Sequence, residues 1–434
     1  MKTDFLIVGS GCSGLYCALQ LPKDKQIVIL SKSSLTKNDS YLAQGGMCML
    51  RDESDYQSYF DDTMYAGHQE NDRTSVEIMI RSSQAVVKDL LHYGVDFTRE
   101  KNGELAFTKE GAHAEKRILF HKDITGKEIT RKLLAQVQSC PNITCLEYHT
   151  MLDLMVENQT CYGAVVLTPD EQLIKIEADY TVLATGGIGG LYRHSTNYSH
   201  LTGDALAIAL RHNIKLKDLH YVQIHPTTLY TREPQERSFL ISESVRGEGA
   251  LLYNKRMERF VNELLPRDLL TIEIHKQMEK DHSEFVWEDL RSIPEEELHS
   301  HFPNIVEHCR SMGYDVFKEC IPVVPAQHYF MGGIWVDHQS RTSMQQLYAI
   351  GETACNGVHG RNRLASNSLL ESLVFAKRAA DEMTIHLPSV RKNTAFVEQF
   401  PLDAYHDVPA LCEEYRTLVL NEIQRCQEID KNYN

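Results

Sequence analysis

Charged and polar residues gather in one short segment late in the chain, and their types are those that bind carboxylates. His359 to Glu371 reads HGRNRLASNSLLE, in which small and polar residues precede an apolar run. That order predicts a helix starting near Ser368, whose N-terminus would stabilise negative charge. Arg363, just before it, could hold a carboxylate through two parallel hydrogen bonds. A single loop arginine is more commonly a solvated charge, so this anion site needs support from elsewhere in the chain.

A glycine-rich segment near the start of the chain has the spacing that binds phosphates. Gly9 to Gly14 reads GSGCSG, between a predicted buried strand at 4–9 and a predicted helix at 13–21. The first glycine allows a tight turn, the second lets the backbone approach a pyrophosphate, and the third lets helix pack on strand. A glycine-rich turn without a ligand is the alternative, and the position between strand and helix argues against it.

The rest of this βαβ unit bears on which dinucleotide binds. Its second strand, at 26–30, ends in Ser31-Lys32, where an acidic residue is expected in nicotinamide-binding proteins. Serine can still bond a ribose hydroxyl, but nicotinamide specificity does not follow from it. Two further clusters, AQGG at 43–46 and TGG at 185–187, would let backbone approach a flat ring system. Each alone would be interpreted as a turn; together with the first motif they favour FAD over NAD.

Apolar strands that end in glycine and alternate with helices predict an α/β fold. The expected fold is a Rossmann-like FAD-binding domain with a parallel sheet and an antiparallel meander, plus an inserted α+β capping domain. Residues 219–327 shift in composition toward His, Glu and Arg and are expected to be largely helical. The predicted boundaries are 1–218 and 328–387 for the FAD-binding domain, 219–327 for the capping domain and 388–434 for a short helical tail.

The individual elements are predicted from periodicity and turn residues. Further buried strands are expected at 180–187 and 347–350. The meander is expected to consist of antiparallel strands at Thr144–Tyr148, Tyr162–Leu167 and Leu173–Glu177. Helices are expected at 56–64, 76–93, 368–383 and 408–429.

Composition excludes several classes of function. The net charge of −15, with no basic run to offset it, argues against nucleic acid as a partner. The 11 cysteines include no CxxC pair, so we expect no metal or iron–sulfur site and a reducing compartment. No segment is apolar for long enough to span a bilayer, and the first residues lead directly into a strand without a signal peptide. These features predict a cytoplasmic protein with no membrane partner.

Many ordered motifs together resemble those of the fumarate reductase/succinate dehydrogenase flavoprotein superfamily. The resemblance covers about residues 1 to 386. The motifs are AQGG at 43–46, DT and AG at 62–67, ATGG at 184–187, TGD at 202–204, QIHPT at 223–227, ESVRGEG at 243–249, PRD at 266–268, HYFMGG at 328–333, YAIGE at 348–352 and the run at 363–371.

Within that superfamily the chain most resembles the L-aspartate oxidases. TKEGAH at 108–113 resembles their TREGGH segment, and HGRNRLASN at 359–367 resembles their HGANRMASN. Fumarate reductases are expected to lack an acidic residue at the position of Glu110. Asp39 stands where membrane-complex relatives carry the histidine that attaches FAD covalently, which implies non-covalent FAD here. The chain is also expected to lack the C-terminal helical bundle of longer relatives.

The resemblance implies roles for individual residues. Arg267, Glu110, Glu243 and Arg246 are expected to be catalytic, with Glu110 binding the substrate ammonium group. His225, His328, Arg363 and Thr227 are expected to bind the substrate. The residues expected to bind FAD are Gly9, Ser10, Gly11, Cys12, Ser13, Gly14, Ser31, Lys32, Ser40, Ala43, Gln44, Gly45, Gly46, Thr185, Gly186, Asp204, Glu352, Asn367, Ser368 and Leu369.

The implied reaction is FAD-dependent oxidation of L-aspartate to iminoaspartate. Electrons would pass to oxygen, giving hydrogen peroxide, or to fumarate. The product would go to quinolinate synthase in de novo NAD biosynthesis. A soluble fumarate reductase is the alternative within the fold, and Glu110 argues against it. A non-catalytic flavin-binding or dicarboxylate-sensing protein is a third hypothesis. The joint retention of Arg267, Arg363, His225 and His328 argues against it, because a sensor needs no proton donor.

Overall fold

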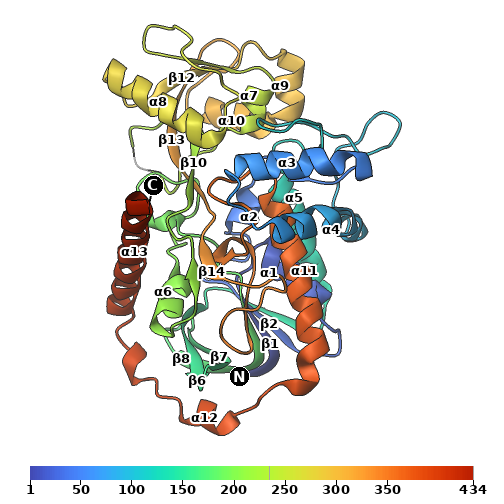
Figure 1. Ribbon diagram of the computed structural model, residues 1–434, viewed down its shortest axis with the longest axis vertical. Coiled ribbons are helices and arrows are strands. Elements are labelled where there is room, and N and C mark those ends of the chain that lie inside the picture. The colour runs from blue at the N-terminus through green and yellow to red at the C-terminus, as the bar shows by residue number, and fades with distance from the viewer. Residues whose placement is uncertain (234, 434) are drawn as a thin grey trace.

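A seven-stranded mixed sheet forms the base of the molecule. The computed structural model describes residues 1–233 and 235–433. The strand order is β5-β2-β1-β8-β7-β6, and β15 also pairs with β8 (Figure 1). The strands are β1 (Lys2–Val8), β2 (Ile27–Leu30), β5 (Ile143–Leu146), β6 (Thr150–Glu157), β7 (Thr160–Leu167), β8 (Leu173–Leu183) and β15 (Leu347–Ala349).

The long strand β8 joins the parallel and antiparallel halves of this sheet. Its first half pairs antiparallel with β7, and its second half pairs parallel with β15 and with β1. An antiparallel meander is present, but it consists of β6, β7 and β8, and β6 was not predicted. Two further details were wrong. The run at Thr144–Tyr148 belongs to β5, which pairs parallel with β2. The runs at 173–177 and 180–184 are one strand, because no turn interrupts them.

Helices cover both faces of the sheet, as the alternation of buried side chains in β1 requires. Phe5 and Ile7 pack into a core with α1, α4, α5 and α11, and Leu6 and Val8 pack into a second core with α6 and α13. The fully apolar strand thus reflects burial on both faces. The helices of this part are α1 (Cys12–Gln20), α2 (Asp39–Leu42), α3 (Tyr56–Ala66), α4 (Arg73–His92), α5 (Thr125–Ser139), α6 (Asp204–Arg211) and α11 (Ser368–His386).

The capping domain lies over one end of this layered unit (Figure 1). It is α+β, with an antiparallel sheet in the order β10-β13-β12-β11, and not largely helical. Its strands are β10 (Val222–Leu229), β11 (Leu251–Tyr253), β12 (Val286–Asp289) and β13 (Ile321–Phe330). Its helices are α7 (Glu243–Gly247), α8 (Arg267–Asp281), α9 (Glu295–His301) and α10 (Pro303–Ser311).

Two features of the capping sheet bear on the site. The edge strand β10 contains Pro226, and its register with β13 shifts between His225 and Thr228. A proline cannot donate to a ladder, so it is tolerated at an edge strand and at a bulge. Strand β13 continues from the capping domain back to the base, and the predicted boundary at 327/328 falls within it.

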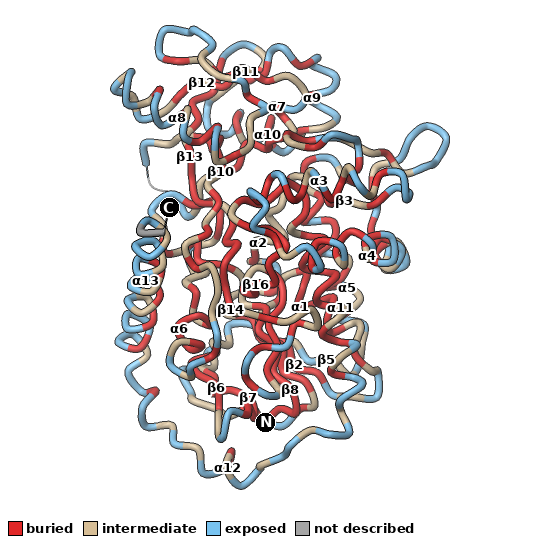
Figure 2. Tube along the Cα trace, viewed as in Figure 1, coloured by how far each residue is buried: buried red, intermediate tan, exposed pale blue. Residues whose placement is uncertain are grey.

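The chain ends in a helix that returns along the side of the molecule. Helix α12 (Thr394–Gln399) lies at the bottom of Figure 1, and α13 (Val408–Tyr433) packs against α6 and rises toward the capping domain. Two small sheets complete the fold, β3 (Met47–Cys48) with β4 (Ile118–Leu119), and β9 (Leu216–Lys217) with β14 (Gly333–Trp335) and β16 (Ala354–Cys355). Buried residues follow the sheets, and the outer face of α13 is exposed (Figure 2). Among the described residues, no helix is both long and apolar enough to cross a membrane.

Candidate active site

One large cavity lies where the parallel strands of the base end beneath the capping domain. Gly9 follows β1, Ser31 follows β2, Thr185 follows β8 and Glu352 follows β15, and all four residues line it. The carboxyl ends of parallel strands are where α/β sheets bind ligands. The empty volume is about 1690 Å³, counted out to open solvent, and it extends from these strand ends to the capping helices α7 and α8.

The glycines of the first motif are required by close approach. Gly9 has φ of 125°, and a Cβ there would lie 2.0 Å from the carbonyl oxygen of Ala184. A Cβ on Gly14 would lie 2.2 Å from the carbonyl oxygen of Gly9, so α1 packs directly on the turn. The N-terminus of α1 borders the cavity, which Gly11 and Ser13 line, and a helix N-terminus is suited to an anionic pyrophosphate.

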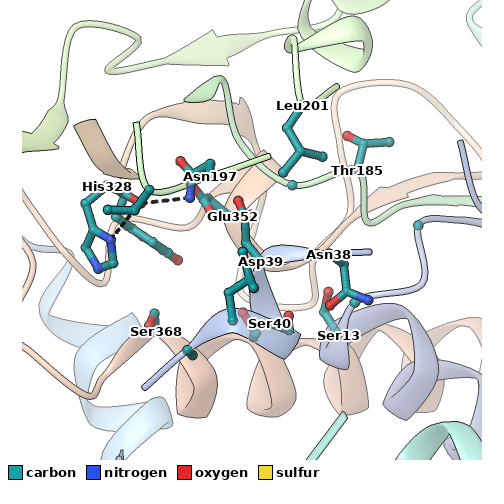
Figure 3. Close-up of a pocket in the computed structure, with 18 of the residues that line it drawn as sticks. Ser13, Asn38, Asp39, Ser40, Thr185, Asn197, Leu201, His328, Glu352 and Ser368 are labelled. Carbon is teal, nitrogen blue, oxygen red and sulfur yellow. Dashed lines mark hydrogen bonds between the residues drawn. The ribbon is translucent and has the colours of Figure 1, made fainter. Parts of the chain in front are cut away.

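Polar atoms without partners show that this cavity suits FAD. Asp39 Oδ2, Gln44 Oε1 and Asn197 Oδ1 are buried, line the cavity and have no hydrogen-bond partner in the described chain. Asp39 and Glu352 project into its middle (Figure 3). Burial, together with the charge of Asp39, raises the pKa of Glu352 to about 8. Such acceptors fit the hydroxyl and ring N–H donors of FAD, while the α1 terminus fits its phosphates.

The far end of the cavity is cationic. Arg363 and Arg267 are both buried and both line it. They share one acceptor. Gln223 Oε1 accepts a hydrogen bond from Arg267 Nη1 at 2.9 Å and another from Arg363 Nε at 3.3 Å. Arg363 also donates to Ser368 Oγ at 2.8 Å. Burial and the neighbouring Arg267 lower the pKa of Arg363 to about 10, so the Arg363 guanidinium is charged at neutral pH.

Two buried histidines stand beside these arginines. The rings of His225 and His328 are 5.2 Å apart, and both residues line the cavity. Burial and the charge of Arg267 hold the pKa of each far below the ordinary value, so both are neutral. His225 Nε2 has no partner in the described chain, and His328 Nδ1 lies 2.8 Å from Thr196 Oγ1. Neutral imidazoles can orient a carboxylate without adding charge.

Glu110 supplies the carboxylate at this end of the cavity. It is 3% exposed and accepts hydrogen bonds from two hydroxyl groups. Ser244 Oγ, in the capping domain, donates at 2.7 Å, and Ser366 Oγ, in the base, donates at 2.6 Å. A Cβ on Gly45 would lie 2.8 Å from Glu110 Oε1, so the AQGG turn borders the same space. The carboxylate therefore lies between the glycine turn and the capping helix α7.

A chain of buried charges leads from the cavity into the capping domain. Arg267 Nε donates to Glu243 Oε2 at 2.6 Å. Burial would raise the pKa of Glu243, but Arg267 and Arg246 outweigh it and lower that pKa. A Cβ on Gly111 would lie 2.4 Å from Glu243 Oε1, so the loop that carries Glu110 also touches this pair. Positioned groups of this kind can transfer protons.

Comparisons with known proteins identify the family. The FAD binding domain family matches residues 4–369. L-aspartate oxidase of Clostridium perfringens is 47% identical over 402 residues, covering 93% of this chain and 91% of that protein. L-aspartate oxidase of Clostridium acetobutylicum is 43% identical over 432 residues, covering 100% and 98%. The chain belongs to the L-aspartate oxidase family.

The structural comparisons show similarity to the fumarate reductases of the wider superfamily. A variant of E. coli quinol fumarate reductase is 30% identical with a TM-score of 0.86, covering 92% of this chain and 72% of that chain. A quinol–fumarate reductase with menaquinol has a TM-score of 0.87 at 30% identity, covering 94% and 75%. The family cofactor is FAD, as the glycine motifs predicted.

The structure brings most of the predicted residues together. Of the residues expected to bind FAD, all line the cavity except Cys12, Gly14 and Asn367. Cys12 and Gly14 lie inside the first turn of α1. The side chain of Asn367 turns away, accepting from Tyr59 and donating to Thr63 Oγ1, so a side-chain contact with FAD is not what it provides.

Two residues expected at the reaction lie one layer behind it. Thr227 and Arg246 do not line the cavity; they contact each other, Arg246 Nη1 donating to Thr227 Oγ1 at 2.9 Å. Thr227 is therefore not placed to bind the substrate directly. Conversely, Gln223, Ser244 and Ser366 hold the arginines and Glu110 but were not predicted. Gln223 stands in the QIHPT motif, which was the one signal that could have identified it.

Proposed function

We propose that this chain oxidises L-aspartate to iminoaspartate with non-covalently bound FAD, and that oxygen or fumarate accepts the electrons. When bound, FAD takes the hydride from the substrate α-carbon. Arg363, Arg267 and the two histidines would hold the carboxylates of the substrate and fix its α-carbon. Orientation of this kind is a large part of the rate that an enzyme supplies.

The position of Glu110 carries this proposal. L-aspartate has two carboxylates and one ammonium group. The far end of the cavity offers two buried arginines and two buried carboxylates, of which Glu243 already pairs with Arg267, while Glu110 forms no ion pair in the described chain. An ammonium group would add a charged donor to Glu110, which accepts from two neutral hydroxyl groups in the described chain, whereas succinate or fumarate would bring no donor to it. A hydrogen bond that involves a charged group contributes about 1.5–3 kcal/mol. The arrangement therefore favours the amino dicarboxylate.

The direct test is reduction of the flavin in the absence of oxygen. The purified holoenzyme is mixed with L-aspartate or with succinate, and absorbance of the oxidised flavin is followed. We expect L-aspartate to bleach it and succinate to leave it oxidised. Bleaching by succinate alone would contradict the proposal and favour a fumarate reductase instead.

Three further parts of the proposal concern the cofactor bond, the product and the location. Asp39 lines the cavity and stands where membrane-complex relatives carry the histidine that attaches FAD, so acid precipitation should leave the yellow colour in the supernatant. Iminoaspartate would pass to quinolinate synthase. All 11 cysteines are free, which fits a cytoplasmic location. Colour that stays in the acid pellet would contradict the non-covalent assignment.

A further inference from the structure

Glu288 is a buried acid that the reaction described above does not use. It lies in β12 of the capping domain, is 0% exposed, and neither carboxylate oxygen has a hydrogen-bond partner in the described chain. Its neighbours across the sheet are the apolar Leu252 and Ile321. An acid without partners is costly in such a place, where an apolar side chain would cost nothing. A role in packing therefore does not account for it.

Arg246 is the complementary case. It is 2% exposed, and its Nη2 has no partner in the described chain. Its other contacts are with neutral groups: Nε donates to the backbone oxygen of Glu263 at 3.2 Å and Nη1 to Thr227 Oγ1 at 2.9 Å. A buried guanidinium normally pairs with a carboxylate. Burial raises the pKa of Glu288 to about 7, and the positive charge of Arg246 opposes that rise. The two groups are therefore near enough to interact electrostatically, although no hydrogen bond joins them.

These two groups stand between the active site and the surface. On the inner side, Arg246 shares helix α7 with Glu243, which pairs with Arg267 at the cavity. On the outer side, Leu252, opposite Glu288 in the sheet, donates its N–H to Glu263 Oε1 at 3.0 Å. Glu263 also binds Arg259, whose side chain is 55% exposed. Glu243 and Arg246 influence each other electrostatically, and so do Arg246, Glu263 and Glu288, so these charged groups form a series from the cavity to the exposed Arg259.

We propose that Glu288 supplies protons to Arg246, and through it to the Glu243–Arg267 pair, when fumarate is the electron acceptor. Reduction of fumarate adds to its double bond the hydride taken from aspartate and one proton from Arg267. Arg267 regains that proton from Glu243, to which it is hydrogen-bonded. Bridging water would carry a proton from Arg246 to Glu243 and from Glu288 to Arg246, because no direct hydrogen bond joins these groups in the described chain, and Glu288 would regain its proton from solvent. The net input is one solvent proton per succinate. This inference rests on the proposed function, because it requires fumarate turnover.

The experiment compares two acceptors in Glu288→Gln, which keeps the shape and cannot supply an acidic proton. Turnover of L-aspartate is measured with fumarate and with oxygen, because only fumarate needs the proton from Arg267. We expect fumarate-dependent turnover to fall at least about tenfold, since proton transfer by a positioned group contributes roughly 10²–10⁴-fold. Oxygen-dependent turnover should change less than about twofold. Glu288→Asp should restore part of the loss.

The pH dependence separates proton supply from packing. Glu288 faces Arg246 from α7, Glu263 from the loop before α8, and Cys309 from α10. It holds its proton below about pH 7, so wild-type turnover with fumarate should fall as pH rises through about 7, and oxygen-dependent turnover should not. Glu288→Gln should lose this pH dependence and show a larger solvent deuterium isotope effect. Because the wild-type profile needs no variant, misfolding of Glu288→Gln cannot hide the result.

The matched control is Glu284→Gln, an exposed glutamate of the same domain that accepts from Tyr230. It should behave as wild type with both acceptors. Unchanged fumarate turnover in Glu288→Gln, equal losses with both acceptors, or a flat wild-type profile would each overturn the relay. So would a wild-type protein that oxidises aspartate but never reduces fumarate. A protein that oxidises no aspartate at all would instead refute the proposed function.

Discussion

The base and the capping domain form opposite walls of one cavity, and different kinds of residue line the two walls. The base wall consists of backbone and short side chains that follow strand ends, such as Gly9, Ser31 and Thr185. The capping wall and its border with the base consist of buried charged side chains, above all Arg267 and Glu243. Backbone walls can bind a cofactor of fixed shape, whereas buried charges can bind and protonate a substrate. Substitutions in the base wall should therefore weaken cofactor binding, and substitutions in the capping wall should impair substrate binding or proton transfer.

Arg267→Leu should have the largest effect on catalysis and little on the cofactor. Arg267 lines the cavity and donates to Glu243, and we propose it as the proton donor to fumarate. Fumarate reduction should fall by roughly 10²–10⁴-fold. Steady-state assay with fumarate measures the loss, and the flavin absorbance of the same sample shows that FAD is retained. Normal fumarate turnover would assign the proton donor to another group.

Arg363→Leu should weaken substrate binding more than the chemical step. The side chain is buried and lies over the ring of Tyr329 at 4.6 Å, so its loss leaves a substrate carboxylate without its partner. Truncation of one partner of such a pair costs about 2–5 kcal/mol, a factor of roughly 30 to several thousand. Titration of the flavin spectrum with L-aspartate measures the dissociation constant. An unchanged constant would place Arg363 outside the substrate site.

Gly14→Ala tests the base wall. Its Cβ would lie 2.2 Å from the Gly9 carbonyl oxygen, so α1 must move away from the phosphate-binding turn. Forced overpacking typically costs about 1–3 kcal/mol, or roughly 5- to 150-fold in FAD affinity. Ultrafiltration and flavin absorbance measure the affinity. Gly247→Ala, whose Cβ meets nothing closer than 3.4 Å, is the matched variant in the capping domain and should keep FAD.

The same contrast explains how much could be predicted from the sequence. The α/β fold with its inserted α+β domain and the FAD cofactor were predicted and confirmed, because the glycine motifs that indicate them are runs of consecutive residues. The pairing of β5 was predicted wrongly, because periodicity shows a strand without showing its partner. Ser244 and Ser366 were missed because they meet Glu110 from segments more than a hundred residues away. The roles of the predicted site residues remain predictions.

Glu110→Gln is the smallest of these changes and the most direct test of the account. It keeps the shape of the side chain and removes the charge that would bind the α-ammonium group of L-aspartate. The measurement is kcat/KM for L-aspartate oxidation and for fumarate reduction, in wild type and variant. We expect aspartate oxidation to fall at least about tenfold, since 1.4 kcal/mol is tenfold in rate, while fumarate reduction is retained or improved. Equal losses for both substrates, or no loss for either, would contradict the account.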